Sequence, residues 1–554
     1  MKQNALLWTL KQIRRRIPAI LLLVMAQVGH SVFTVLFALG SRGVIDSAVA
    51  GDRTLFLAAC LRQALIIGGI LLCLALSRHL RERLSADLER DWKRKLLKGL
   101  LHGDYAQVSE YHSAELLNRL NNDVAKVNDG VLTILPGTAG LVTKLAAAVA
   151  VLGTLDPAFT LAAAALGTLV IGVTAVMRRK LKELNKRVSD QDGRVSGYLQ
   201  ETMEKLLLVQ AMDVSAEVER RSEILLADRY ALQRKRKNVS LMANFCVSLM
   251  RYGAGFLALC WCASRLLLGQ MSFGSLTAVI QLVNQLQAPF VNLSGVMPKY
   301  IAMIASAERL QELEAIQGEP EHSVQDPLAV YEKMEAIRGE DLSFSYGRDP
   351  VFSNAEFVLP KGAFAVITGA SGIGKSTLLK LLLGVFHRSG GELYLQGREA
   401  QIPIDRSTRR LFAYVPQGNL LFSGTIRDNL TIVRSDATEE QLRKAVYAGC
   451  MDSFLSELPD GLDTVLGESG AGLSEGQAQR LAIARAVLSG APILLLDECT
   501  SALDEATEAA VLQRLKSLED RTCIAVTHRP AALALCDWRL EVHEGAIRSG
   551  RNIV

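Results

Sequence analysis

The sequence predicts a multidomain membrane protein in which an all-α transmembrane domain of six helices precedes an α/β domain that carries a P-loop. Six apolar runs fall within the first 315 residues, and each is close to the ~20 residues that a helix needs to cross the hydrocarbon core. Farther along, short β-type runs such as Phe364–Ile367 and Ile493–Leu496 alternate with helical patterns. Such alternation is typical of a parallel-sheet nucleotide-binding domain.

Composition agrees with a membrane-embedded portion. The chain of 554 residues is long enough for several domains, and its hydrophobic fraction of 49% is high for a soluble protein. The 9 cysteines include no C-x-x-C pair and no Cys/His cluster with zinc spacing, so we expect neither disulfides nor a metal cluster. The first apolar run outlasts a typical signal peptide and no A-x-A site closes it, so no cleavable signal is expected.

The membrane domain is expected to begin with an amphipathic helix at residues 4–16, lying on the membrane surface, because apolar residues alternate there with Lys11 and Arg14–Arg16. The spans themselves are predicted at residues 17–40, 58–77, 131–154, 157–177, 241–268 and 274–297. The second of these is short and contains Arg62 and Gln63, so its boundary is the least defined.

The distribution of basic residues predicts the orientation of the spans. Four basic runs fall on one side of the membrane, at Arg14–Arg16, Arg78–Lys98, Arg178–Arg187 and Arg234–Lys237. Because cytoplasmic loops carry the excess of lysine and arginine, this side is expected to be cytoplasmic, together with both termini. Arg234–Lys237 is therefore interpreted as a membrane-flanking cluster, and no nucleic-acid partner is expected.

Two cytoplasmic projections are predicted. About fifty mostly polar residues join the second span to the third, and a similar stretch joins the fourth to the fifth, without Gly/Pro clusters. Both stretches are expected to continue the membrane helices into the cytoplasm. Their turning points are predicted at Tyr111–Ala114 and Met212–Ser215, either as places where a cytoplasmic motor grips the helices or as ordinary loops.

A phosphate-binding loop follows a linker that is predicted at residues 316–335. The motif G-x-x-x-x-G-K-[ST] has glycines that let backbone N–H groups wrap phosphates. Its lysine reaches the outer phosphates, and its first hydroxyl can ligate Mg²⁺. The sequence therefore predicts an ATP and Mg²⁺ site at Gly369, Ala370, Ser371, Gly372, Ile373, Gly374, Lys375, Ser376 and Thr377.

A second phosphate-contacting element, Leu473–Gln477, lies about a hundred residues after the P-loop. With both elements present, residues 336–554 resemble the nucleotide-binding domain of an ATP-binding-cassette (ABC) transporter, a P-loop ATPase domain. Residues 1–315 resemble the six-helix domain of exporter-type members, down to the pentapeptide Ser306–Leu310 after the last span. The resemblance therefore implies a half-transporter, with one membrane domain fused to one cassette.

The resemblance implies further nucleotide contacts. Tyr346 would stack on adenine, although it could instead be an ordinary strand aromatic. In the signature element, Ser474, Gly476 and Gln477 would contact the nucleotide. Glu475 stands where the family usually has glycine, and its carboxylate would be repelled by phosphate. We expect a competent site with an altered rate.

The resemblance also implies the catalytic residues. Lys375 would reach the outer phosphates and Gln417 would sense Mg²⁺. His528 would be the switch histidine, although it could instead be a packed surface histidine. Asp497 would hold Mg²⁺ through water, together with Ser376 and Gln417. Glu498, fixed at the end of four aliphatic residues, would orient the attacking water.

A dimer is implied because the P-loop of one cassette faces the signature of another in this family. A homodimer with two active sites is the economical choice, and a heterodimer with a related half-transporter stays open. For the substrate, polar residues in the spans favour an amphipathic molecule with a carboxylate or phosphate, such as a peptide, lipid or drug-like compound. Helix contacts or a position at the membrane interface are an equal alternative for these residues: His30, Lys144, Arg251, Gln281, Asn284, Gln285, Gln287 and Asn292.

Three functions compete. The preferred one is an ATP-hydrolysing exporter that works by alternating access in the cell membrane, as a multi-pass protein of a bacterial inner or plasma membrane with a cytoplasmic ATPase domain. The second is an importer on the exporter scaffold, for a metal–siderophore type of substrate. The third is an ATP-switched membrane sensor or regulator, whose ATPase no transported compound would alter.

Overall fold

The computed structural model describes residues 2–318, 326–398, 400–418, 421–467, 470–518 and 520–551, except for the side chains of 2–4, 164–179, 247, 251, 287–295 and 327. The chain divides into two compact units. The membrane unit comprises Met1–Lys98 and Ser113–Ala315, and the cassette unit comprises Gly99–His112 and Ile316–Val554. The short segment 99–112 therefore packs with the cassette although it lies between two membrane helices in the sequence.

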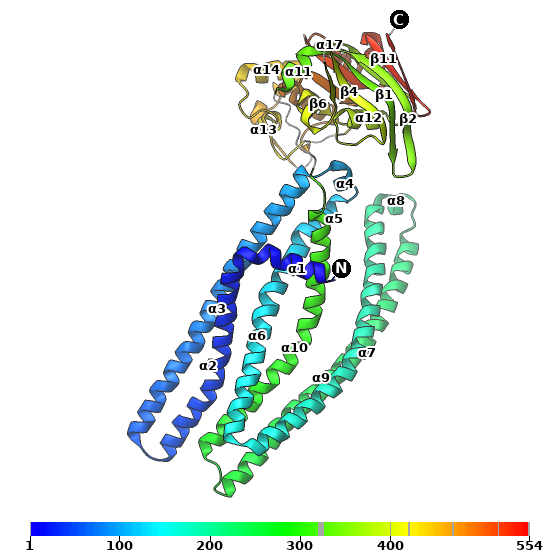
Figure 1. Ribbon diagram of the computed structural model, residues 1–554. Helices are drawn as coiled ribbons and strands as arrows, with labels where there is room; N and C mark the ends of the chain where they lie inside the picture. Colours follow the sequence, from blue (N-terminus) through cyan, green and yellow to red (C-terminus); the bar gives the residue numbers. More distant parts are fainter. Residues whose placement is uncertain are drawn as a thin grey trace. The chain divides into compact units, whose positions relative to one another are not determined.

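Six long helices run through the described part of the membrane unit (Figure 1): α2 (Ile17–Val49), α3 (Arg53–His102), α6 (Val124–Leu155), α7 (Pro157–Glu204), α9 (Ser215–Leu267) and α10 (Phe273–Glu314). Among the described residues, four helical stretches have the length and hydropathy to cross a membrane: Ala5–Val49, Arg53–His102, Ser113–Leu155 and Ser215–Leu267. Side chains in α7 and α10 lie partly outside the description. The predicted class of the first domain, an all-α transmembrane domain, is confirmed.

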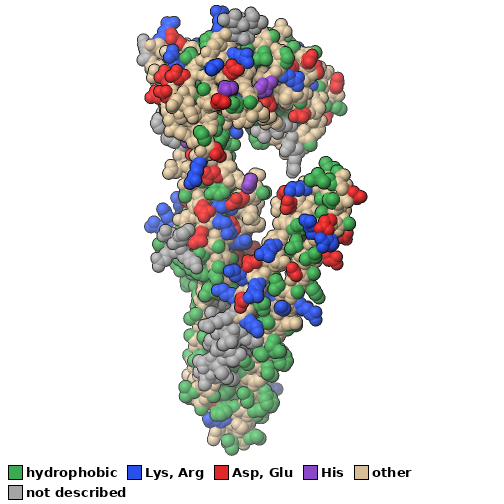
Figure 2. Space-filling model, turned by 90° about the vertical axis from the view of Figure 1, so that its right-hand side faces the viewer, with side chains coloured by type: hydrophobic (Ala, Val, Ile, Leu, Met, Phe, Trp, Pro, Cys, Tyr) green, Lys and Arg blue, Asp and Glu red, His purple; other side chains and the backbone are tan. Residues whose placement is uncertain are grey.

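Apolar and charged side chains separate along this unit. Figure 2 shows hydrophobic side chains gathered over the lower part of the membrane unit, with lysine, arginine, aspartate and glutamate higher on its projecting arm. Inside, Val35, Ala148, Leu152 and Leu282 are buried in a cluster that joins α2, α6 and α10. Gly130 lets α6 approach α10, since a Cβ there would lie 2.6 Å from Met303 Cγ. Small residues of this kind permit close packing of membrane helices.

Short connections join consecutive helices of the membrane unit at two places. α2 ends at Val49 and α3 begins at Arg53, whereas α6 and α7 are separated only by Asp156. Asp156 accepts a hydrogen bond from the backbone N–H of Phe159 at 3.0 Å and another from Trp261 Nε1 at 3.0 Å. The first bond caps α7 and the second ties it to α9.

Of the two turns at the tips of the predicted projections, the first begins earlier than predicted and the second overlaps its predicted position. The first starts at Gly103–Asp104, before the predicted Tyr111–Ala114, because Asp104 caps a short helix, α4 (Tyr105–Ser109), by accepting a bond from Ala106 N at 2.9 Å. A second break at 110–112 precedes α5 (Ser113–Asn118). The second turn is preceded by α8 (Leu206–Ala211), and the chain reverses at 212–214, where Asp213 has φ 53°. The predicted Met212–Ser215 overlaps this reversal.

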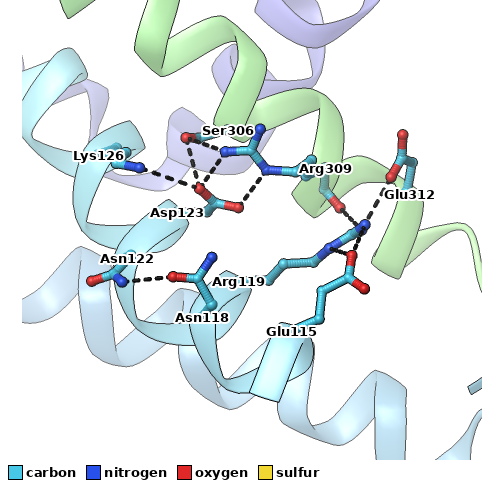
Figure 3. Close-up of polar contacts among 9 residues, drawn as sticks. All are labelled: Glu115, Asn118, Arg119, Asn122, Asp123, Lys126, Ser306, Arg309 and Glu312. Atoms are coloured by element: carbon cyan, nitrogen blue, oxygen red, sulfur yellow. Dashed lines mark hydrogen bonds and ion pairs between the residues drawn. The ribbon is translucent and has the colours of Figure 1, made fainter. Parts of the chain in front are cut away.

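A cluster of ion pairs joins α5 and α6 to the end of α10 (Figure 3). A π-helical turn, η2 (Arg119–Asp123), leads into α6. Asp123 is fully buried and accepts bonds from Arg309 Nε at 2.7 Å, Arg309 Nη2 at 2.6 Å and Ser306 Oγ at 2.9 Å. Arg119 donates to the carbonyl of Arg309 at 3.0 Å and to Glu312 Oε2 at 3.0 Å. The pentapeptide Ser306–Leu310 thus binds the base of the third span to the sixth.

In the cassette unit, a six-stranded sheet is flanked by a four-stranded sheet. The first has the order β12 (Ala546–Arg551), β11 (Trp538–His543), β3 (Phe364–Thr368), β10 (Thr522–Val526), β9 (Ile493–Asp497) and β6 (Phe412–Val415), parallel except between β11 and β12. The second is antiparallel, with the order β2 (Asp349–Pro360), β1 (Met334–Tyr346), β4 (Gly390–Gly397) and β5 (Gln401–Pro403). A small pair joins β7 (Gly424–Thr425) to β8 (Val465–Leu466). The predicted α/β class is confirmed.

Helices cover both faces of the parallel strands. Every residue of β3, β9 and β10 is buried, as in a sheet packed on two sides. One face packs with the antiparallel sheet and α12 (Lys375–Leu382), and the other with α16 (Glu475–Leu488), α17 (Glu505–Lys516) and α18 (Pro530–Leu535). A third apolar cluster is formed with α13 (Ile426–Thr431), α14 (Glu439–Ala448) and α15 (Asp452–Leu455).

Part of the predicted linker belongs structurally to the cassette. Helix α11 (Pro327–Lys333) lies within the predicted linker 316–335, of which residues 319–325 are outside the description. Tyr331 on this helix is buried, and its hydroxyl lies 3.0 Å from Thr522 Oγ1 at the start of β10.

Candidate nucleotide site

The P-loop connects the carboxyl end of β3 to the amino end of α12. Its backbone takes conformations that only glycine adopts readily, with φ 151° at Gly369 and φ 109° at Gly374. A Cβ at Gly374 would lie 2.4 Å from Val351 Cγ1. The loop therefore curls over the first turn of α12, where unpaired backbone N–H groups form an anion site.

Lys375 lies inside this loop. Its side chain is largely buried, and Nζ donates to the carbonyls of Gly369 at 2.9 Å and Ala370 at 2.8 Å. An ammonium group has three donors, so one remains for a ligand. Within the described residues no carboxylate forms an ion pair with this cation. A buried cation held only by neutral carbonyls is suited to an anionic ligand such as a phosphate.

Oxygen atoms suited to Mg²⁺ meet beside the loop. Ser376 Oγ donates to Asp497 Oδ1 at 2.9 Å, and Asp497 is 2% exposed at the end of β9. Hydroxyl and carboxylate oxygens are the donors that Mg²⁺ prefers, so these two residues fit the ion. The other carboxylate oxygen accepts a bond from Tyr414 Oη at 3.1 Å. Burial and the nearby charge of Asp497 raise the pKa of Tyr414, so the phenol stays protonated as a donor.

Glu498 follows directly and has an unusual backbone. Its φ is 47°, a left-handed value that is costly for a residue with a Cβ. The backbone N–H of Glu498 donates to the carbonyl of Val526 at 3.0 Å, and Gln417 Nε2 donates to Glu498 Oε2 at 2.9 Å. The neighbouring β10 and the loop after β6 therefore fix this carboxylate. His528 lies exposed after β10, without a hydrogen bond to the other site residues in the part of the chain that the structure describes.

An aromatic cluster lies beside the P-loop. The hydroxyl of Tyr346 is 3.2 Å from Thr377 Oγ1, and the ring meets Phe344 and Phe386 edge-on at centroid distances of 5.0 Å and 5.5 Å. Tyr346 is still 44% exposed, which leaves ring surface for an adenine base. Tyr105 of α4 contacts Phe386 in turn, with centroids 5.8 Å apart. The ring cluster thus runs from the P-loop to the segment between two membrane helices.

The signature element forms the start of α16. Ser474 Oγ accepts a bond from Gln477 N at 3.2 Å, and Gln477 Oε1 accepts one from Ser474 N at 2.8 Å, which is a capping box. Ser474 and Glu475 are exposed, and a Cβ at Gly476 would lie 3.0 Å from the carbonyl of Ala502. Within the described residues no hydrogen bond joins this element to the P-loop of the same chain.

The loop 501–504 is held against α16 by buried polar side chains. Gln479 Nε2 donates to Ser501 Oγ at 3.1 Å, and Gln479 Oε1 accepts from Ala502 N at 3.1 Å. On the other side, Arg529 donates to the carbonyl of Leu503 at 3.1 Å. These contacts place the loop between the signature helix and the segment that carries His528.

Sequence reasoning missed three contributors to this site: Tyr414, Phe386 and Tyr105. Tyr414 was detectable in principle, because a hydroxyl in the otherwise apolar strand Phe412–Val415 requires a polar partner. Neither Phe386 nor Tyr105 belongs to a motif in the sequence, and their association becomes visible only in the fold.

Comparison with known proteins agrees with this architecture. A family model described as the ABC transporter transmembrane region matches residues 17–290, and one described as ABC transporter matches residues 352–501. The chain belongs to the ABC transporter family. It is a multi-pass membrane protein with an ATP-binding ATPase domain coupled to transport, and half-transporters of this family generally function as dimers.

Several characterised relatives are transporters. The chain is 29% identical over 488 residues to an ATP-dependent lipid A-core flippase of Desulfotalea psychrophila, covering 84% of this chain and 82% of that protein. It is 36% identical over 281 residues to the mycobactin import ATP-binding/permease protein IrtB of Mycolicibacterium smegmatis, covering 50% and 48%. It is 34% identical over 282 residues to the mitochondrial iron–sulfur clusters transporter ATM1 of Yarrowia lipolytica, covering 50% and 39%.

A solved structure supports the fold over nearly the whole chain. A bacterial Atm1-family ABC exporter with ATP bound superimposes with a TM-score of 0.77 at 24% sequence identity, covering 98% of this chain and 95% of that one. The half-transporter architecture, with one membrane domain and one cassette in a single chain, is therefore confirmed.

Proposed function

We propose that this ABC transporter is a homodimeric exporter that hydrolyses ATP with Mg²⁺ and moves an amphipathic substrate (a peptide, lipid or drug-like molecule) by alternating access. The observation that carries the ATPase chemistry is the fixed position of Glu498, held by Gln417 next to the Ser376–Asp497 pair. Export is supported by the lipid A-core flippase, which aligns with 84% of this chain.

The proposed roles are those that the family resemblance implies, and the side-chain geometry of Lys375, Ser376, Asp497 and Glu498 supports them. Lys375 and the loop N–H groups would hold the outer phosphates, and Ser376, Asp497 and Gln417 would hold Mg²⁺. When bound, the ion neutralises charge on the phosphate oxygens. Glu498 would orient the attacking water and accept its proton, because its left-handed backbone and its bond to Gln417 fix the carboxylate. His528, exposed after β10, would contact the γ-phosphate.

Two chains would share each site. Ser474 and the first turn of α16 face solvent, and such a helix start attracts phosphate. The absence of described hydrogen bonds to the P-loop of the same chain supports its use by a partner's nucleotide. A homodimer is the simplest proposal because Lys375, Glu498, Ser474 and Gly476 all occur in this one chain. A heterodimer with a related half-transporter is the alternative partner arrangement.

The membrane unit supports a substrate with polar groups. Gln281 and Gln285 lie one turn apart on α10, and the side-chain oxygen of each is buried without a hydrogen-bond partner among the described residues. His30 and Lys144 are half-buried on α2 and α6. Such groups in a membrane domain are suited to the polar part of an amphipathic ligand. Of the other predicted polar residues, Asn284 is exposed. The side chains of Arg251, Gln287 and Asn292 lie outside the described residues.

We further propose that the protein lies in a cell membrane, bacterial inner or plasma, with both termini and the cassette in the cytoplasm. The exposed basic residues Lys11, Arg14 and Arg15 near the N-terminus support this orientation. Reaction of single engineered cysteines with a membrane-impermeant maleimide would test it. Labelling of a cysteine beside Arg14 in inverted vesicles but not in intact cells is expected, and the reverse pattern would contradict the orientation.

The proposed transport is tested by ATPase assays on the full chain in lipid nanodiscs, with peptides, lipids and drugs as added compounds. An exporter should be stimulated by its substrate and should accumulate it in inverted vesicles, whereas Glu498→Gln should abolish both effects. Import of a metal–siderophore complex is the second candidate, favoured by the 36% identity to the mycobactin import protein. Uptake into right-side-out vesicles loaded with ATP would support import and contradict export.

A further inference from the structure

An apolar groove opens on the membrane unit where α1 (Lys2–Ile13) meets α2 and α6. Its volume is about 670 Å³, within the range of small-ligand sites. The lining comes from these three helices and includes Ile13, Ile17, Val24, Ala139 and Thr143. The hydroxyl of another lining residue, Thr138, donates to the carbonyl of Ile134 in its own helix at 2.6 Å. The groove therefore offers a ligand mainly hydrocarbon.

The wall formed by α1 is fixed in place by polar contacts on its other side. Trp8 Nε1 donates to Glu314 Oε2 at 2.6 Å, and Gln12 Nε2 donates to the same oxygen at 2.7 Å. The rings of Trp8 and Trp92 pack with centroids 6.2 Å apart. At the turn η1 (Arg14–Arg16), Arg16 pairs with Asp87 at 3.0 Å and Asp91 at 3.0 Å. The groove is thus a built feature of the unit and not a gap beside a loose helix.

Three basic residues neighbour lining residues of this groove in the sequence. Lys11, Arg14 and Arg15 alternate in sequence with the lining residues Leu10, Ile13 and Ile17, and all three are exposed. Within the described residues none of the three forms an ion pair, in contrast to Arg16. Three cations next to the lining of a hydrocarbon groove are complementary to a molecule with an anionic head and an apolar tail.

We infer that this groove binds an anionic phospholipid from the cytoplasmic leaflet, with one acyl chain between α1, α2 and α6 and its phosphate beside Arg14 and Arg15. An acyl chain in the groove would supply apolar contacts that the three helices do not make with one another there. Each basic residue near an anionic membrane surface adds attraction for the lipid headgroup. The groove includes no residue of α10, so this lipid is distinct from a substrate held by Gln281 and Gln285. It would tie α1 to α6 and stabilise the start of the membrane unit.

The charge requirement is tested by native mass spectrometry of the full chain after extraction from nanodiscs that contain equal amounts of phosphatidylglycerol and phosphatidylcholine. The wild type should retain phosphatidylglycerol preferentially. Arg14→Gln with Arg15→Gln should lower this preference about fivefold for each charge removed, whereas Arg14→Lys with Arg15→Lys should keep it. Arg234→Gln with Lys235→Gln is the matched control, because these two basic residues are equally exposed next to another span.

The groove itself is tested with Ala139→Phe, which fills it, against Ala146→Phe, which adds the same ring to an exposed position of α6 outside the lining. Only the first should lose the retained lipid. Equal retention by Ala139→Phe and the wild type would overturn the site. Equal retention of phosphatidylcholine, or no effect of the double glutamine variant, would overturn the charge recognition and leave only a non-specific lipid shell.

Discussion

Replacing Arg309 by alanine should destabilise the membrane unit, because it removes the arginine that pairs with the buried carboxylate of Asp123. Asp123 is fully buried, and two of its three side-chain hydrogen bonds come from Arg309, at 2.7 Å and 2.6 Å. The third comes from Ser306 at 2.9 Å and would remain. The variant therefore leaves a buried carboxylate whose remaining partners are the Ser306 hydroxyl and the Lys126 ammonium group, 4.0 Å away.

The size of the effect is bounded from both sides. Loss of one partner of a buried ion pair costs about 3–5 kcal/mol. Asp123 could take up a proton instead of staying charged. For a carboxyl with an ordinary pKa near 3.9, protonation costs about 4 kcal/mol at pH 7, so the cost of the unpaired charge cannot exceed that value. The Arg309 side chain is 40% exposed, so water will partly replace it. We expect a loss of about 2–3 kcal/mol, or roughly 5–10 °C in the unfolding midpoint.

Thermal unfolding of the purified chain in detergent measures this loss, and a second variant identifies its cause. Asp123→Leu with Arg309→Leu removes both charges and should recover most of the stability, because an apolar pair can replace a buried ion pair. The loss in Arg309→Ala should also shrink as the pH is lowered from 8 to 5.5, because Asp123 can then take up a proton. Wild-type stability of Arg309→Ala, or no recovery in the double variant, would refute the reasoning.

Four further results are expected for the cassette. Glu498→Gln should lower ATP turnover by roughly 10²-fold or more while ATP binding persists; near-normal turnover in a phosphate-release assay would remove the proposed role of Glu498. Lys375→Ala and Ser474→Ala should each be inactive, but mixed dimers should regain activity in one composite site; proven mixed dimers without activity would count against independent shared sites. Glu475→Gly should raise the apparent ATP affinity in turnover by up to about fivefold, because it removes one charge repulsion in water. Glu475→Asp keeps the charge and should not raise the affinity. An unchanged affinity in the glycine variant would place the Glu475 side chain away from the phosphates. Tyr105→Ala should reduce substrate stimulation of the ATPase but change nucleotide affinity by less than about tenfold, with Tyr105→Phe as the control that keeps the ring; full stimulation in the alanine variant would separate α4 from coupling.

Much of this architecture could be predicted from the sequence because its signals are local. Apolar runs of membrane length and the P-loop glycines each define a structure within a few dozen residues. The pentapeptide Ser306–Leu310 is a local signal of the same kind. Its structural role could not be predicted, because its partner Asp123 lies far away in the sequence and on another helix. Long-range pairing of this kind depends on how α6 and α10 pack, which a single sequence does not state.

The turn between α3 and α5 shows a different limit. The segment 103–114 contains several polar residues that can end a helix, and the prediction chose Tyr111–Ala114. The fold turns earlier because Asp104 caps α4, and the backbone N–H of Asp104 donates to the carbonyl of Gln317 at 2.9 Å. Both residues belong to the cassette unit. A contact with Gln317, which follows the membrane unit in the sequence, therefore decides between turns that are locally similar.

Because Tyr105 packs within the cassette unit, the ring cluster beside the candidate nucleotide site includes a residue of the segment that joins two membrane helices. Tyr105 contacts Phe386, and Phe386 contacts Tyr346, whose hydroxyl reaches Thr377 of the P-loop. An adenine stacked on Tyr346 would restrict that ring and its neighbours. Since α4 connects α3 to the start of the third span, restricting these rings would also restrict the segment at which two membrane helices end. Ring packing inside the cassette unit thus joins the proposed adenine position to the segment between two membrane helices.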